Sequence, residues 1–207
     1  MQNNKYELTD IAHLQYPFLR RIRALRNIGD KVKAGDFGGF VESEQNLSYE
    51  PGDEAWLFDE AISCNEARVD KDSILKDNAI VSGQAYITQG AELGGNTQAM
   101  DKAYISGALL GVQARAYGSS IIVSSAKTHK APQLRGEVTV YGKIAGDVRV
   151  SGRLVIMENE RIQNNSMDAL LINNGYRSII PAEARAELKP QIIGTVRRRN
   201  NVIEMAR

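Results

Sequence analysis

The chain contains little of what usually stabilises or equips a small protein: one cysteine, two histidines and only 6% aromatic residues among 207 residues. The single cysteine, Cys64, excludes a disulfide framework and a zinc site of cysteine and histidine ligands. The net charge of +1 provides no overall field for nucleic acid or an anionic membrane. No apolar run approaches the roughly 18 residues of a membrane span, and none resembles a signal peptide. We therefore expect a cytoplasmic protein without membrane segments, metal or nucleic-acid partner.

What the sequence has instead is a repeat of six residues. Nine positions spaced six apart hold small side chains without interruption, and a mostly aliphatic residue follows two positions after each. Gly, Asn or Asp recurs two positions later, as expected for a turn that visits positive φ. The small residues are Ala55, Ala61, Ala67, Ser73, Ala79, Ala85, Ala91, Thr97 and Ala103. Beyond Ala103 the register slips by one residue and continues through Ala108, Ala114 and Ser120.

A period of six fits neither a helix nor a plain alternating strand. It fits a short strand followed by a turn, so that three hexads form one triangular coil of about 18 residues. Because no hexad can bury its apolar side alone, the coils must stack to form a core. We predict an all-β solenoid, a parallel β-helix of roughly five coils over 55–157. The residues predicted to point inward are Leu57, Val69, Leu75, Val81, Ile87, Leu93, Ile105, Leu110 and Ile122.

Residues 1–54 do not follow the hexad and are predicted to form an N-terminal cap. The segment 19–26 permits two interpretations, because its apolar residues suit one face of a helix and also alternate with arginines as in a strand. The glycine-rich segment 33–44 indicates turns, including one at Gly38-Gly39.

The same block carries motifs: R-I-R-A-L-R at 21–26, V-K-A-G-D-F-G-G-F-V-E-S-E at 32–44 and N-L-S at 46–48. Together with the hexads, these motifs resemble bacterial and prophage proteins of the hexapeptide-repeat superfamily, one of which is described by similarity as an acyltransferase. The resemblance implies a left-handed β-helix, against the right-handed preference of ordinary parallel crossovers. It also implies that 19–26 is a strand that caps the open end of the solenoid, a β cap.

Two further parts of the chain depart from the repeat. The polar segment 124–137 contains Pro132 and is predicted to be a loop pushed out of the coil, after which the repeat resumes. Residues 158–207 are predicted to form an α-helical or mixed appendage, with helices over 167–173 and 181–188. The expected division of the chain is therefore a cap at 1–54, a β-helix at 55–157 and an appendage at 158–207.

Enzymes of the hexapeptide-repeat superfamily transfer an acyl group from acyl-CoA, with a histidine that deprotonates the acceptor, at sites commonly shared between subunits of a trimer. The resemblance therefore suggests His129, in the predicted loop, as a general base. Lys127, Lys130 and Arg135 would lie near the phosphates of acetyl-CoA or another acyl-CoA. The other interpretation of His129 is an exposed histidine among solubilising lysines. The second histidine, His13, lies in the cap, and two histidines cannot supply the three metal ligands of the superfamily's carbonic-anhydrase branch.

Charged residues leave a further choice open. Acidic side chains occupy many predicted turns, either as solvated corners of the triangular prism or as an acidic docking face. They are Asp59, Glu60, Glu66, Asp70, Asp72 and Asp77. Arginines cluster at 20–26 and 197–199, but no aromatic residues interleave with them to stack on nucleic acid. We predict a non-catalytic interaction or scaffold module that forms a homotrimer and binds a protein partner. The alternative is an acyl-CoA-dependent acetyltransferase that uses His129.

Overall fold

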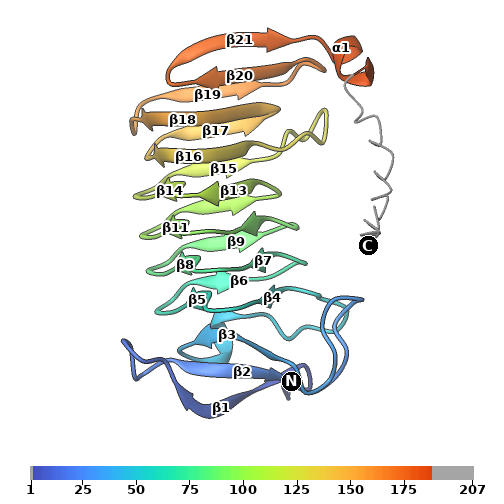
Figure 1. Cartoon of the computed structure of the whole chain (residues 1–207), viewed down its shortest axis with the longest axis vertical. Helices are drawn as coiled ribbons and strands as arrows, with labels where there is room; N and C mark the ends of the chain where they lie inside the picture. Colours follow the sequence, from blue (N-terminus) through green and yellow to red (C-terminus); the bar gives the residue numbers. More distant parts are fainter. Residues whose placement is uncertain (1, 188–207) are drawn as a thin grey trace, which may run out of the picture.

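The first coils of the solenoid are 18 residues long, as the six-residue period predicts. Trp56 pairs in parallel with Ile74, which pairs in turn with Glu92. The computed structural model describes residues 2–187 and shows an elongated all-β molecule, with the cap at one end and the C-terminal strands at the other (Figure 1). None of the described helices is long and apolar enough to cross a membrane.

Each coil contributes one strand to each of three faces. The first face consists of β4 (Trp56–Leu57), β7 (Ile74–Leu75), β10 (Glu92–Leu93), β13 (Leu109–Val112), the first halves of β16 (Gln133–Val140) and β18 (Val148–Ile156), and β20 (Ala169–Asn173). The second consists of β3 (Phe37–Val41), β5 (Ile62–Ser63), β8 (Ile80–Val81), β11 (Gln98–Ala99), β14 (Arg115–Ala116) and the second halves of β16 and β18. The third consists of β6 (Arg68–Val69), β9 (Tyr86–Thr88), β12 (Tyr104–Ser106), β15 (Ile121–Val123), β17 (Lys143–Gly146) and β19 (Arg161–Asn164).

The core is built from rows of aliphatic side chains that run along the stack. On the third face, for example, Val69 pairs with Ile87, which is followed by Ile105 and Ile122 in successive coils. All nine residues predicted to point inward are buried, and none is more than 3% exposed. Their burial confirms the register that the hexads predicted. Burying one such side chain stabilises the fold by roughly 1.5–3 kcal/mol.

Aspartates at one corner tie each coil to the next. Asp59 and Asp77, which follow strands of the first face, adopt left-handed backbone conformations with φ of 54° and 59°. The Asp59 carboxylate accepts a hydrogen bond from the Asp77 N–H at 3.1 Å, and the Asp77 carboxylate accepts one from the Gly95 N–H at 2.6 Å. These acidic residues are therefore corners of the prism, and their carboxylates also bond the backbone one coil away.

The N-terminal cap is an antiparallel sheet that continues the second face. β1 (Tyr6–Ala12) pairs with β2 (Arg20–Ala24), β2 pairs with β3, and β3 pairs in parallel with β5. The strand expected within 19–26 is therefore confirmed, and the helical interpretation is wrong. The short 3-10 helix η1 (Glu44–Asn46) follows β3. The Tyr6 ring packs edge-on against Trp56 of the first coil, with ring centroids 6.2 Å apart.

The paired glycines of the cap lie in a strand and not in the predicted turn. Gly38 and Gly39 belong to β3, and a Cβ atom on Gly39 would overlap the backbone carbonyl of Ala61. Glycine is needed here because β3 approaches the first coil closely.

The excursion from the solenoid is shorter than predicted. Residues 124–132 leave the coil between β15 and β16, but β16 already begins at Gln133, and Leu134 is fully buried. Apolar and polar residues alternate along β16, as they do in a strand with one buried face. The prediction of a loop through 137 is wrong because the polar outward residues obscured this alternation.

Parallel pairing also continues beyond residue 157. β19 pairs with β17 and β20 pairs with β18, so the described part of the third face holds six strands where roughly five coils were expected. The helix predicted over 167–173 is wrong, because β20 occupies this segment and pairs antiparallel with β21 (Tyr176–Ile180). Helix α1 (Ala182–Glu187) lies within the segment 181–188 predicted to be helical. The rest of the expected appendage, 188–207, lies outside the described residues, and the left-handed winding stays a prediction.

Candidate functional site

His129 lies in the loop 124–132, which projects from the solenoid beside β15 and β16 (Figure 1). The Ser125 hydroxyl organises this loop by accepting hydrogen bonds from the N–H groups of Lys127 and Thr128, both at 3.2 Å. The His129 N–H donates to the Ser125 carbonyl at 2.8 Å, and its φ of 53° is left-handed. These bonds hold the backbone, whereas the His129 side chain is exposed and its imidazole is hydrogen-bonded to none of the described residues.

The four residues suggested for acyl transfer come from two different elements. Lys127 and Lys130 are exposed in the same loop as His129. Arg135 instead lies in β16 and lines a trough on the first face that the three loop residues do not line. A catalytic base is usually oriented by a second group, and no carboxylate among residues 2–187 bonds to the His129 ring.

The trough beside Arg135 is open because two adjacent outward positions are occupied by glycines. Gly94 and Gly111 occupy the same outward position in neighbouring coils, with Lys76 one coil before them and Arg135 one coil after. The trough has a volume of about 450 Å³. The Lys76 stem lies against Gly94, and its ammonium forms an ion pair with Glu92 at 3.7 Å. The trough therefore has a backbone floor and a cationic side chain at each end.

A strained residue lies at the edge of this trough. Val112 has a φ of 66° and is 56% exposed. Asp77, Gly95 and Gly136 occupy the same corner in other coils, and these residue types tolerate positive φ better than valine does. A β-branched residue in this conformation costs on the order of 1–3 kcal/mol. Sequence analysis missed this strain, although the signal was a valine at a turn position of the repeat.

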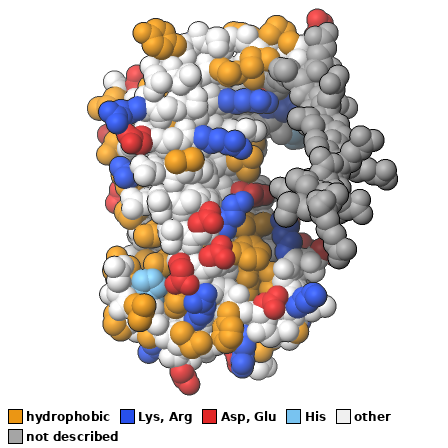
Figure 2. All heavy atoms as spheres, in the orientation of Figure 1, with side chains coloured by type: hydrophobic (Ala, Val, Ile, Leu, Met, Phe, Trp, Pro, Cys, Tyr) orange, Lys and Arg blue, Asp and Glu red, His pale blue; other side chains and the backbone are white. Residues whose placement is uncertain are grey.

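Hydrophobic side chains gather at the tip of the hairpin between β1 and β2. Figure 2 shows hydrophobic groups over the cap end of the molecule and again at the opposite end. We call the exposed apolar residues of this hairpin the cap tip. They are Ile11, Leu14, Tyr16 and Phe18, with exposed fractions of 47%, 98%, 42% and 55%.

The cap tip is held in place by the second histidine and by a small separate cluster. The His13 Nδ1 atom accepts hydrogen bonds from the N–H groups of Gln15 and Tyr16, both at 3.2 Å. The His13 ring stacks on Tyr16 and meets Phe40 edge-on, with centroids 5.2 and 4.8 Å apart. Next to the tip, Leu19 is buried against Phe40 and Ile62 outside the main core. His13 thus has a structural role in this turn.

Lys5 and Cys64 are among the ionisable groups near the cap whose pKa values are displaced. Lys5 is fully buried, and its Nζ donates to the Ser48 carbonyl at 2.8 Å. Burial lowers the pKa of the Lys5 ammonium from its ordinary 10.5 to about 8, although the charge of Asp53 opposes this change. Burial, with a smaller contribution from Glu42, raises the pKa of the Cys64 thiol. A raised pKa disfavours the thiolate, so Cys64 is a poor nucleophile.

Several other acidic residues of the predicted turns are also used by the fold. Glu60 forms an ion pair with Arg21 at 3.1 Å, and Glu66 accepts a hydrogen bond from Gln84 at 2.7 Å. Together with the corner aspartates, these contacts favour solvated structural corners over an acidic docking face. Asp70 differs from the others because its carboxylate is almost completely buried, with a side chain only 7% exposed.

No protein-family model, curated protein or solved structure matches this chain in comparisons with known proteins. The parallel β-solenoid is shown by the strand pairing itself. The hexapeptide-repeat superfamily stays an interpretation of the cap motifs and the repeat.

Proposed function

We propose that this chain is a non-catalytic interaction module of the hexapeptide-repeat type that assembles with copies of itself in the cytoplasm. The observation that supports the proposal most strongly is the cap tip, where Leu14 is 98% exposed and Phe18, whose ring lies 6.2 Å from that of Tyr16, is 55% exposed. Contiguous apolar side chains rimmed by polar ones mark contact surfaces in soluble proteins.

The cap tip is suited to binding because it is already ordered. The bonds to the His13 ring and the Leu19 cluster hold the hairpin in one conformation. A preorganised surface loses less conformational entropy when it binds. The same proposal includes a homotrimer, because the resemblance implies one and a triangular prism packs readily around a threefold axis.

The test replaces two residues of the cap tip, Leu14→Ser together with Phe18→Ser, in the full chain. Light scattering at micromolar concentration should show a trimer for the wild type and smaller species for the variant. Because both side chains are mainly exposed, the melting temperature should change little. Val155→Ser, at a half-exposed residue of the second face, is the matched control and should leave assembly intact. A wild type that is monomeric, or a variant that assembles normally, contradicts the proposal.

The alternative function is acyl transfer from acetyl-CoA, and one observation favours it. Lys127, His129 and Lys130 are all exposed and lie in one loop between β15 and β16, where a second subunit would be able to complete a site. If the chain is an acyltransferase, His129→Ala should lower turnover by about 10²–10⁴-fold with an unchanged melting temperature. Acetyl-CoA at about 100 times its dissociation constant should stabilise the protein by about 2.7 kcal/mol. Robust turnover that survives His129→Ala would contradict both functions.

A further inference from the structure

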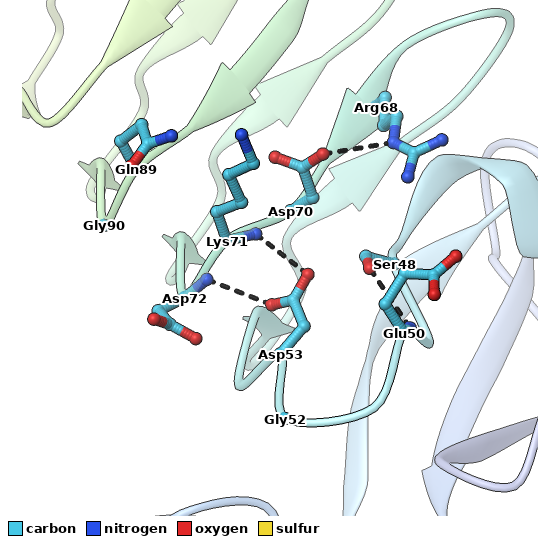
Figure 3. A pocket seen from close by; sticks show the side chains of 10 residues that line it. All are labelled: Ser48, Glu50, Gly52, Asp53, Arg68, Asp70, Lys71, Asp72, Gln89 and Gly90. Carbon is cyan, nitrogen blue, oxygen red and sulfur yellow. Dashed lines mark hydrogen bonds and ion pairs between the residues drawn. The ribbon is translucent and has the colours of Figure 1, made fainter.

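The two ends of the solenoid differ in how their outermost backbone groups are satisfied. At the cap end, the Asp53 carboxylate accepts hydrogen bonds from the N–H groups of Lys71 at 2.9 Å and Asp72 at 3.0 Å (Figure 3). The Asn46 amide donates to two backbone carbonyls of the first coil, both at 2.9 Å. At the other end, β21 is the last strand of its sheet and pairs only with β20 among the described residues (Figure 1). The outer side of β21 is therefore an open edge.

The hairpin between β20 and β21 determines which backbone groups lie on this edge. Its two-residue loop is Asn174-Gly175, with φ of 48° and 84°, and the residues that flank such a loop form a hydrogen-bonded pair. Hydrogen-bonded pairs alternate along an antiparallel ladder, so the first, third and fifth residues of β21 bond to β20. The N–H and C=O groups of the second and fourth residues, Arg177 and Ile179, point outward, where no described strand pairs with them.

β21 lacks the features that usually protect an edge strand from other strands. Natural edges carry lysines, other charged residues or prolines, or they are interrupted by bulges. The edge strand of the cap, β1, has an irregular register between Leu8 and Ala12 and carries Glu7 and Asp10. β21 has one charged residue, Arg177, and pairs with β20 without a break over all 5 of its residues. Its outer edge is therefore suited to accept a further strand.

We propose that this further strand is β21 of a second copy, which runs antiparallel about a twofold axis at Ser178. The outward groups of Arg177 and Ile179 are two residues apart, which is the spacing at which an antiparallel strand pairs with a copy of itself. Arg177 of each copy exchanges two hydrogen bonds with Ile179 of the other. Tyr176, which is 84% exposed, then lies opposite Ile180 of the other copy, and such aromatic–aliphatic pairs stabilise sheets.

This contact goes beyond the proposed function, because it lies at the end of the solenoid opposite the cap tip. The two contacts use different residues, so each can be removed without the other. One short strand forms a smaller contact than a stable dimer needs. The pairing should therefore be populated at protein concentrations above the micromolar range, where it joins copies end to end.

The test is disulfide cross-linking of the full chain in a Cys64→Ser background, with oxidised glutathione as the oxidant, which traps a weak contact. In the proposed register the two Ser178 residues form a pair without hydrogen bonds. Their Cα atoms lie about 4.5 Å apart, within the range that a disulfide spans. Ser178→Cys should therefore give a covalent dimer on a non-reducing gel. Arg177→Cys is the matched control and should cross-link about tenfold more slowly, because its two copies lie diagonally about 7–8 Å apart.

A charge exchange tests the same register in the Ser178→Cys chain. Ile179→Lys places a lysine directly opposite Arg177 of the other copy, and opposed like charges destabilise a sheet. This change should slow cross-linking several-fold. Adding Arg177→Glu should restore the rate, because each lysine then faces a glutamate. Met157→Lys, at an exposed residue outside β21, should leave the rate unchanged.

The proposal is overturned if Ser178→Cys stays monomeric on the gel, as it will if residues 188–207 of the same chain or another protein occupy the edge. It is also overturned if Ser178→Cys and Arg177→Cys cross-link at the same rate, which would indicate random collision. The cross-link should persist when Leu14→Ser and Phe18→Ser are introduced into the Ser178→Cys chain. Its persistence there distinguishes this contact from assembly through the cap tip, and its loss would contradict an independent contact at β21.

Discussion

Replacing Lys5 with methionine tests the electrostatics of the cap through the pH dependence of stability. The Lys5 side chain is fully buried, and its ammonium has one hydrogen bond, to the Ser48 carbonyl. Burial lowers its pKa to about 8 in the folded chain, against an ordinary 10.5 that applies when the chain is unfolded. The folded state therefore binds fewer protons than the unfolded state between these pH values. By linkage, stability must rise with pH in this window.

The magnitude follows from the displacement of the pKa. At 1.36 kcal/mol per pKa unit, the change from 10.5 to about 8 corresponds to roughly 3 kcal/mol of penalty, present in full below pH 8. About 2 kcal/mol of this penalty should disappear between pH 8 and pH 10. In Lys5→Met, position 5 no longer titrates, so this part of the pH dependence should be absent from the variant.

The measurement is the free energy of unfolding in urea at a series of pH values from 8 to 10, for the wild type and Lys5→Met. Raised pKa values of the Cys64 thiol and the Tyr6 hydroxyl work in the opposite direction as pH rises through their ordinary values. Both proteins share these groups, so the difference between the two curves isolates Lys5. Lys31→Met, at an exposed lysine of the cap, should give a curve parallel to the wild type. Parallel curves for the wild type and Lys5→Met would refute the reasoning.

Three further changes test the solenoid itself. Val81→Asp should unfold the chain, because an unpaired charge would enter a narrow apolar core; circular dichroism that shows melting within a degree of wild type means that the register is wrong. Val112→Gly should stabilise the protein by about 1 kcal/mol, because the strain of a left-handed valine is removed; urea titration checks this, and an unchanged midpoint contradicts it. Gly39→Ala should destabilise by about 1–3 kcal/mol, because the Ala61 carbonyl occupies the space of the added methyl; equal stability in the same assay argues against the close approach of β3.

The β-solenoid was predictable because its contacts repeat. Leu57 packs in line with Leu75 and Leu93 at one spacing along the chain, so a six-residue period is enough to specify which residues meet. The prediction failed where the period is broken. The segment after Pro132 looked like a loop because its outward residues are polar, although Leu134 continues the inner row of the first face.

The candidate sites were predictable only in part. Polarity correctly placed His129 in a projecting loop, yet Arg135 lies in a strand because β16 begins earlier than expected. Asp70 was grouped with the other acidic turn residues, since its burial depends on contacts from other parts of the chain. One of these contacts, from the Tyr86 hydroxyl, comes from a neighbouring coil, and the residues adjacent to Asp70 in the sequence do not predict it.

The sequence by itself determined the stacked coils, the inward rows and the small residues at the corners, because each of these depends on spacing within a local repeat. Only the tertiary structure decided how the cap closes on the first coil. Lys5 meets Ser48 across 43 residues, and Asp53 clamps the turn at Lys71 one coil away. These contacts join a non-repeating segment to a distant part of the chain, so the six-residue repeat does not predict them. They form because the end of the solenoid must cover its apolar interior and satisfy its open backbone groups.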